Sequence, residues 1–343
     1  MTDRWPRLKL PMTTQDLDTT NPTHNVFALS WVALANVAGC DFPIQNLPFA
    51  VFRRTGSSEA FCGGVAIGDQ AIDMAEVART ACLDGVAHAA AERCALPALN
   101  DFFSMGPPAW KALRHSLFKL LEKAFYGPRV GALRACLIAQ GEVEFTLPTR
   151  IGDYTDFYTS LDHAMNIGKI FRPDQPITSN FKWMPIAYHG RVSSIGVSGQ
   201  TLRRPVGQAM PPGATAPVYG PCSRLDYELE LGIYVGTGNA QGEPVALANA
   251  EQHVFGICLL IDWSTRDIQF WEMAPLGPFL GKNFCTTIST WIVTMGALAP
   301  YRQAARARRS ALTFVGHQLQ APVLDHRANG HAPHHGRLQF AQR

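Results

Sequence analysis

The stretch LDYELELGIYV, from Leu225 to Val235, alternates in the way expected of a β-strand, in which neighbouring side chains point to opposite faces. One face is apolar and consists of Tyr227, Leu229, Leu231, Ile233 and Val235. The opposite face carries three carboxylates in a row, Asp226, Glu228 and Glu230. Because like charges on one strand face repel one another, this arrangement requires either a compensating cation or full solvation.

Both interpretations of the acidic face are open from the strand alone. Carboxylate oxygens without neighbouring Cys or His ligands favour a hard cation such as Mg²⁺, Ca²⁺ or Mn²⁺, which would remove the repulsion. Alternatively, the carboxylates are free in solvent, and Asp226 only caps or turns the entry to the strand. Acids elsewhere in the chain bear on this choice.

One such acid is Asp262, which follows the uncharged apolar run 254–261. That run predicts a fully buried strand, and an acid at its exit is costly unless it is paired or binds a metal. A third acidic segment, IGDYTDF, places Asp153 and Asp156 in a predicted loop. Acids from three separate segments are therefore available for one cation.

A short helix is predicted directly after Asp262, with Ser264 as a possible N-cap. Arg266 and Gln269 lie three residues apart and so share one face of this helix. They are candidates for stabilising negative charge in a reaction. The alternative for Arg266 is a structural salt bridge to Asp262 or Glu272.

Two further residues are candidates for chemistry. His163 is predicted in the first turn of a helix that Ser160 caps, and a histidine beside acids and aromatics is a candidate general base. Its alternative role is purely structural. Lys282 lies in a Gly- and Pro-rich loop that leads into a strand, where it is either exposed or an oxyanion partner beside an acidic site.

Composition limits the class of protein. The chain has 343 residues, of which 47% are hydrophobic and 17% charged, which is sufficient for one large or two medium domains. The longest uncharged apolar stretch, 26–40, is too short to span a membrane. Eight scattered cysteines without a CxxC motif indicate buried thiols in a reducing cytoplasm. The net charge of +3 gives no reason to expect nucleic acid as a partner.

The final segment, 300–343, differs from the rest of the chain. It contains seven arginines and one acid, together with five of the eleven histidines, and it shows no sustained helical or strand periodicity. A metal-binding or nucleic-acid-binding tail is one interpretation. The favoured hypothesis is an aberrant, disordered segment that does not belong to the fold. The predicted domains are 1–125, a small β domain with a helical linker, then 126–299, a partial catalytic domain, and finally this tail.

Several motifs together resemble the fumarylacetoacetate hydrolase family. They are IGDYTDFYTSLDHAMNIGKIFR, YHGRVSSIGVSGQTLRRPVGQ, DYELELGIYVG, IDWSTRDIQFWE and PLGPFLGKNFCTTIS, and they are dense from about 150 to 299. The resemblance implies an α+β fold that is mostly β. A small SH3-like N-terminal domain would be joined to a larger catalytic domain with a β-roll or barrel-like core, incomplete at its C-terminal end. It also implies a cytoplasmic homodimer.

The same resemblance implies roles for individual residues. The implied metal site, for Mg²⁺ and/or Ca²⁺, comprises Asp156, Glu228, Glu230, Asp262, Lys282 and Thr286. The implied catalytic residues are His163 as the base, with Arg266, Gln269 and Lys282 stabilising negative charge. The implied substrate contacts are Tyr158, Arg172 and Tyr188.

The implied reaction is hydrolysis of the carbon–carbon bond of the diketo acid 4-fumarylacetoacetate to fumarate and acetoacetate, as in tyrosine and phenylalanine catabolism. Two positions depart from the family pattern, because Cys285 replaces a usual glycine and Met273 a usual tyrosine. The family's threonine on the substrate and the glutamate that orients its histidine have no counterpart after Ala299, so we expect impaired activity. A related acylpyruvate hydrolase or decarboxylase, or a catalytically inactive fragment, are the alternatives.

Overall fold

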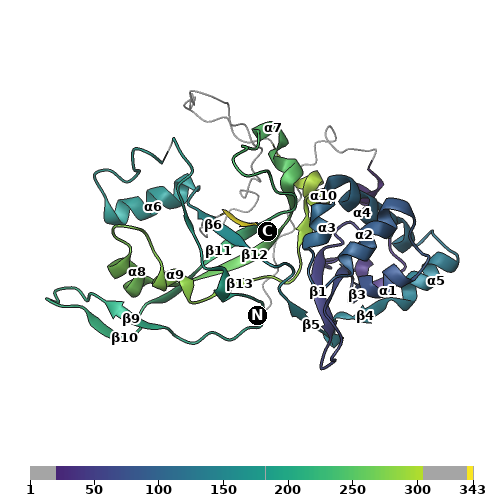
Figure 1. Cartoon of the computed structure of the whole chain (residues 1–343), viewed down its shortest axis with the longest axis horizontal. Helices are drawn as coiled ribbons and strands as arrows, with labels where there is room; N and C mark the ends of the chain where they lie inside the picture. The colour runs from purple at the N-terminus through teal and green to yellow at the C-terminus, as the bar shows by residue number, and fades with distance from the viewer. Residues whose placement is uncertain (1–20, 182, 304–337, 343) are drawn as a thin grey trace.

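The computed structural model describes residues 21–181, 183–303 and 338–342, and it divides into two parts that lie side by side (Figure 1). The N-terminal part combines a small sheet with a group of helices, and the second part is built on a longer, mostly antiparallel sheet. The fold is therefore mixed α and β, as expected. Within the described ranges, no helix is long and apolar enough to cross a membrane.

The first sheet has five strands among the described residues, in the order β4-β3-β2-β1-β5, and every neighbouring pair is antiparallel. Their bounds are β1 Phe49–Arg54, β2 Cys62–Ile67, β3 Gln70–Asp73, β4 Leu137–Ala139 and β5 Val143–Thr146. The last two strands lie beyond residue 125. The first sheet therefore takes strands from both sides of the expected domain boundary.

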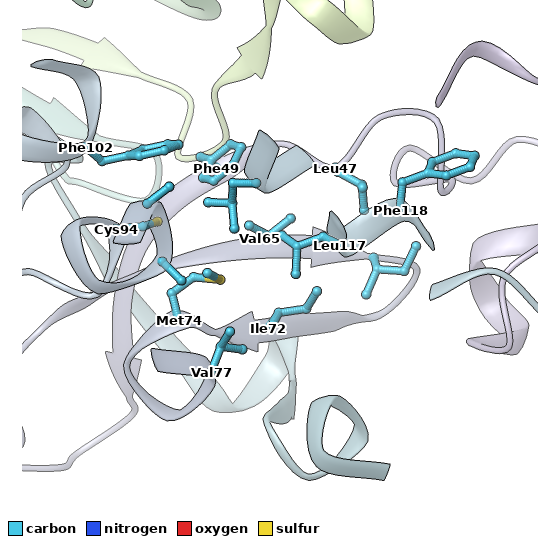
Figure 2. Close-up of a cluster of buried hydrophobic side chains, with 14 of the residues drawn as sticks. Leu47, Phe49, Val65, Ile72, Met74, Val77, Cys94, Phe102, Leu117 and Phe118 are labelled. Atoms are coloured by element: carbon cyan, nitrogen blue, oxygen red, sulfur yellow. The ribbon is translucent and has the colours of Figure 1, made fainter. Parts of the chain in front are cut away.

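The helices that cover this sheet follow β3 and precede β4 in the chain. They are α1 Met74–Arg79, α2 Gly85–Cys94, α3 Asn100–Ser104, α4 Pro107–Leu121 and α5 Pro128–Ala135. The longest, α4, begins with two prolines, whose missing N–H groups cost nothing in a first turn. Its buried side chains recur at helical spacing and pack on the sheet, where Figure 2 shows Leu117 near Val65 and Phe118 near Leu47.

The second sheet has the order β7-β6-β15-β11-β12-β13-β8 in the described part of the chain, and β14 pairs with β12. Its strands are β6 Asp153–Phe157, β7 Ala187–His189, β8 Ile195–Val197, β11 Leu225–Val235, β12 Val254–Thr265, β13 Thr286–Ile288, β14 Val293–Thr294 and β15 Leu338–Gln342. The long hairpin of β11 and β12 is its centre and pairs along its whole length. A separate hairpin, β9 Val206–Ala209 with β10 Val218–Pro221, projects away from it (Figure 1).

Short helices connect these strands. They are α6 Leu161–Phe171, α7 Leu247–Ala250, α8 Arg266–Glu272, α9 Leu280–Asn283 and α10 Met295–Leu298. Helix α8 follows β12 directly, and its N-cap is Thr265 rather than the expected Ser264, which lies within the strand. Lys282 lies on α9 and not in a loop.

Two expectations about the chain differ from the structure or lie outside it. The segment with Asp153 and Asp156 is strand β6 rather than a loop. Residues 304–337 and 343, most of the expected tail, lie outside the described residues. Residues 338–342, which were also expected to be disordered, form β15, antiparallel to β6 and parallel to β11.

One hydrophobic cluster joins the two parts. Phe255 of β12 is 1% exposed and stacks on Phe103 of α3 with ring centroids 4.0 Å apart. It also meets Phe49 and Trp110 edge-on, at 5.6 and 5.2 Å. A backbone bridge between Phe49 and Ile292 lies in the same region. The second sheet is thus anchored in the core of the first part.

Candidate metal centre

Three carboxylates meet in the second sheet. Asp156 of β6, Glu230 of β11 and Asp262 of β12 each offer an oxygen, and these oxygens all lie within 4.8 Å of one another. All three residues are buried, with exposures of 1%, 2% and 2%. Three carboxylates this close and this deep repel strongly unless positive charge balances them. The group can therefore hold a metal ion.

Strand register explains how the acids converge. Glu228 of β11 is paired with Asp262 of β12, and Asp262 with Thr286 of β13, so the three form one row across the sheet. Glu230 lies two residues further along the same face of β11 as Glu228. Thr286 is 1% exposed, so its hydroxyl belongs to the same buried polar group.

A buried lysine supplies positive charge beside the acids. Lys282 is 2% exposed, and its Nζ forms ion pairs with Asp262 and, at 3.0 Å, with Glu228. Burial raises the pKa of Asp262 to about 6, and the Lys282 ammonium acts in the opposite direction. The negative charges of Glu228 and Asp156 also contribute to this raised pKa.

Arg266 joins the acidic face from helix α8. Its guanidinium donates to Glu228 at 2.8 Å, to Asp226 at 2.9 Å and to Gln269 at 3.1 Å. Burial acts to lower the pKa of Arg266, but the two carboxylates outweigh it and raise the pKa. The salt bridges considered for Arg266 from the sequence were therefore to the wrong acids.

The four acids expected to hold a metal fall into two groups. Asp156, Glu230 and Asp262 lie close to one another, whereas Glu228 accepts a hydrogen bond from Arg266 and forms an ion pair with Lys282. Asp226 lies at the rim and helps to hold Arg266. The sequence suggested only a cap or turn for Asp226, because its partner is forty positions away.

The candidate base lies just past strand β6. His163 is 5% exposed in the first turn of α6, where its backbone N–H donates to the Ser160 side chain at 3.2 Å, as the cap pattern predicted. Its ring meets the Tyr158 ring edge-on, with centroids 5.2 Å apart. The structure thus brings the expected base against one of the expected substrate contacts.

The other two expected substrate contacts come from different elements. Tyr188 of β7 is half-buried and pairs with Asp156 in the strand register. Arg172 is exposed at the C-cap of α6, at the opposite end of that helix from His163. Only Tyr188 is therefore brought beside an acid of the metal centre by strand pairing.

Tyr154 is a buried neighbour of the site that the sequence did not single out. It is 5% exposed, and its hydroxyl faces the Thr286 side chain. A Cβ at Gly190 would lie 1.8 Å from the Tyr154 ring, so glycine is required there for close packing. The i, i+2 relation of Tyr154 and Asp156 would have indicated a shared face if this segment had been taken as a strand.

A cavity of about 440 Å³ opens beside β6 and β7. The residues that line it are Asp153, His189, Gly190, Arg191, Val192, Ser193 and Asn283. His189 and Asn283 directly follow Tyr188 and Lys282 in the sequence, but the lining includes none of the three clustered acids.

Comparisons with known proteins agree with this architecture. The model of the fumarylacetoacetate hydrolase C-terminal domain matches residues 154–325, and that of the fumarylacetoacetase N-terminal domain matches residues 45–148. The first match extends past residue 299 into the expected tail. The second ends just after β5, which is the last strand of the first sheet.

Curated relatives are similar over most of the chain. A fumarylacetoacetase of Oryza sativa subsp. japonica is 47% identical over 268 residues, which cover 77% of this chain and 62% of the relative. The human fumarylacetoacetase is 46% identical over 264 residues, with coverage of 76% and 62%. A solved fumarylacetoacetate hydrolase from Exiguobacterium antarcticum is 16% identical, covers 72% of this chain and 66% of its own, and has a TM-score of 0.41.

The two family matches together span both parts of the molecule, and the acid cluster lies within the C-terminal match. The chain therefore belongs to the fumarylacetoacetate hydrolase family. It spans about 62% of the length of the curated relatives that it matches.

Proposed function

We propose that this chain hydrolyses the carbon–carbon bond of 4-fumarylacetoacetate to give fumarate and acetoacetate. The observation that carries the proposal is the meeting of three buried carboxylates from three strands, with Lys282 and Arg266 beside them. The similarity to relatives named fumarylacetoacetase supports this substrate.

The donor set fits a hard divalent cation, Mg²⁺ and/or Ca²⁺. All donors are carboxylate oxygens, and no cysteine or histidine is among the clustered described residues. Asp156, Glu230 and Asp262 would hold the ion, with Glu228 and Thr286 adjoining it. Lys282 would contribute its positive charge beside the ion. When bound, the cation supplies Lewis acidity toward a carbonyl oxygen.

The side chains around the acids perform the remaining steps. His163 takes a proton from the attacking water as the water oxygen bonds to the substrate carbonyl carbon, and the π electrons of that carbonyl move to its oxygen. The carbonyl then re-forms as the carbon–carbon bond breaks. The electron pair of that bond leaves with acetoacetate, and the proton on His163 passes to the resulting carbanion. Arg266, Gln269 and Lys282 stabilise the negative charge as it develops.

Binding of the substrate is proposed on the same basis. Tyr158, Arg172 and Tyr188 would contact the diketo acid, and Tyr158 is already packed against His163. The resemblance to the family further supports an SH3-like first domain, a β-roll in the second, and a cytoplasmic homodimer.

The test is turnover of 4-fumarylacetoacetate by the purified chain with Mg²⁺ or Ca²⁺, followed by loss of the diketone absorbance and by assay of fumarate. We expect turnover to require the metal and to be lost in Glu230→Gln. The matched control, Glu251→Gln, removes a surface carboxylate paired with Arg302 and should retain activity.

Two results would contradict the proposal. Equal turnover by Glu230→Gln and the unmodified chain would show that the acid cluster is not the reaction centre. Cleavage of acylpyruvates with 4-fumarylacetoacetate left intact would favour the related hydrolase or decarboxylase. Metal binding is measured separately by calorimetry.

A further inference from the structure

Glu272, in the last turn of helix α8, makes contacts that the proposed reaction does not use. Its carboxylate accepts three backbone N–H groups from one short segment: Phe279 at 2.9 Å, Leu280 at 3.1 Å and Gly281 at 2.7 Å. These are the N–H groups at the start of α9, which have no partner within the helix itself. The half-buried Glu272 side chain therefore provides hydrogen-bond acceptors for all three of these N–H groups.

The segment that Glu272 holds leads directly into Lys282. Only one peptide bond separates Gly281, whose N–H makes the shortest of the three hydrogen bonds, from the lysine that forms ion pairs with Asp262 and Glu228. The Lys282 ammonium must lie at the end of a buried four-carbon stem, so its position depends on where its backbone is held. Glu272 acts on that backbone.

Close packing of Gly281 against Gln269 also links the start of α9 to helix α8. A Cβ at Gly281 would lie 2.8 to 2.9 Å from the Gln269 side chain and backbone, so helices α8 and α9 approach as closely as glycine permits. The Thr265 hydroxyl donates to the Gly281 carbonyl at 3.3 Å. Helix α8 thus carries Arg266 and Gln269 and also contacts the segment that carries Lys282. Figure 1 shows α8 and α9 next to each other.

We propose that Glu272 is a positioning residue, which holds the 279–281 backbone on helix α8 so that the Lys282 ammonium is kept between Asp262 and Glu228. An ionised carboxylate suits this task because it is an acceptor at every lone pair, and charge-assisted hydrogen bonds are the stronger ones. A glutamine of the same shape offers one acceptor oxygen and turns an NH₂ group toward a backbone N–H. The role of Lys282 in the reaction rests on the proposed function, but its positioning does not.

The test compares Glu272→Gln with the control Glu251→Gln in the full chain, using two measurements that need no substrate. Amide hydrogen exchange of residues 279–281 should become at least about tenfold faster in Glu272→Gln and stay unchanged in the control. Acylation of Lys282 by a small amine reagent, read by mass spectrometry, should also become several-fold faster, because the lysine is almost fully buried in the intact protein.

Turnover supplies the third measurement. We expect kcat for 4-fumarylacetoacetate to fall about tenfold or more in Glu272→Gln with a smaller change in KM, because Lys282 stabilises charge that develops during the reaction. Unchanged exchange and unchanged Lys282 labelling would overturn the inference. So would altered exchange with unchanged kcat in an active enzyme. If the unmodified chain has no turnover, the proposed function fails, and exchange and labelling alone decide the positioning of Lys282.

Discussion

The two sheets differ in which side chains they bury. In the first sheet every residue of β2 is buried and none is charged. In β11 of the second sheet, Glu230 is 2% exposed, whereas the apolar neighbours Tyr227 and Leu229 are 59% and 46% exposed. The first sheet follows the ordinary rule that apolar side chains lie inside. The stretch 227–230 of β11 reverses it, because its acid face is turned inward, whereas Ile233 and Phe255 further along the hairpin are buried in the usual way.

The reversal is possible because charges in the second sheet are balanced from outside the strand. Lys282 and Arg266 come from two short helices and reach Glu228 and Asp262 across the sheet. Unpaired, such buried carboxylates would each cost several kcal/mol. The main hydrophobic cluster is held by apolar contacts instead, as Figure 2 shows around Phe49 and Met74. The acid cluster and the hydrophobic cluster therefore depend on different kinds of contact.

The largest expected effect comes from Asp262→Asn. It removes one member of the acid cluster and leaves the buried Lys282 ammonium without one of its partners. We expect metal affinity and turnover to fall by more than about 100-fold. Loss of a residue that only hydrogen-bonds to a metal ligand already costs about 10–100-fold. Calorimetric titration with Mg²⁺ checks this. Glu144→Gln, in the surface pair with Arg53 of the first sheet, is the control, and an equal loss there would remove the contrast between the sheets.

Phe255→Ala should lower the stability of the protein more than its metal affinity, the reverse of what we expect for Asp262→Asn. The side chain is 1% exposed and packs among aromatic rings of the first part, so its truncation should lower the free energy of unfolding by about 3–5 kcal/mol. Urea denaturation measures this loss. Mg²⁺ affinity, measured on the folded fraction, should change less than in Asp262→Asn. A larger change in affinity would show that the core and the site are not separate.

Asp267→Asn should alter the pH dependence of stability. Burial acts to raise the pKa of Asp267, but hydrogen bonds from the Cys222 thiol, from Ser223 and from the Ile268 N–H outweigh it and lower the pKa to about 2. Because the pKa is lower in the folded state, Asp267 contributes to stability at pH values above its unfolded-state pKa, near 4. This contribution disappears as the pH falls toward the folded-state pKa of about 2.

The variant should therefore lose up to about 1 kcal/mol at neutral pH, a figure reduced by the partial exposure of the site. Its stability should also fall less steeply between pH 4 and pH 2. Urea midpoints measured across this range check both points, and parallel curves for the two proteins would contradict the assignment to Asp267.

The smallest effect is expected from Leu259→Ser, on the apolar face of β12. Leu259 is 55% exposed, so the exchange should change the free energy of unfolding of the monomeric chain by no more than about 0.5 kcal/mol. Val65→Ser in β2 replaces a side chain that is 0% exposed and should cost several times more. Thermal unfolding of both variants compares the two sheets directly. Similar losses would show that the exposed face of β12 is covered in solution.

Much of the local structure was predictable because short-range patterns determine it. Alternation predicted β11, and Ser160 was predicted as the cap before His163. The segment 153–157 was not identified as a strand because its polar residues resemble a loop. Only its pairing with β7 and β15 gives it an extended form.

The sequence by itself determined which residues could serve the site, since Glu228 and Glu230 share a face through the two-residue period of a strand. Local spacing did not determine which acids meet; the family resemblance named these acids together, and pairing between distant strands brings Asp156, Glu230 and Asp262 into one group. Tertiary structure likewise decided the partners of Arg266, the burial of Lys282 and the hydrogen bonds from α9 to Glu272. Each depends on contacts between separate elements, which have no signature in the local spacing of residues.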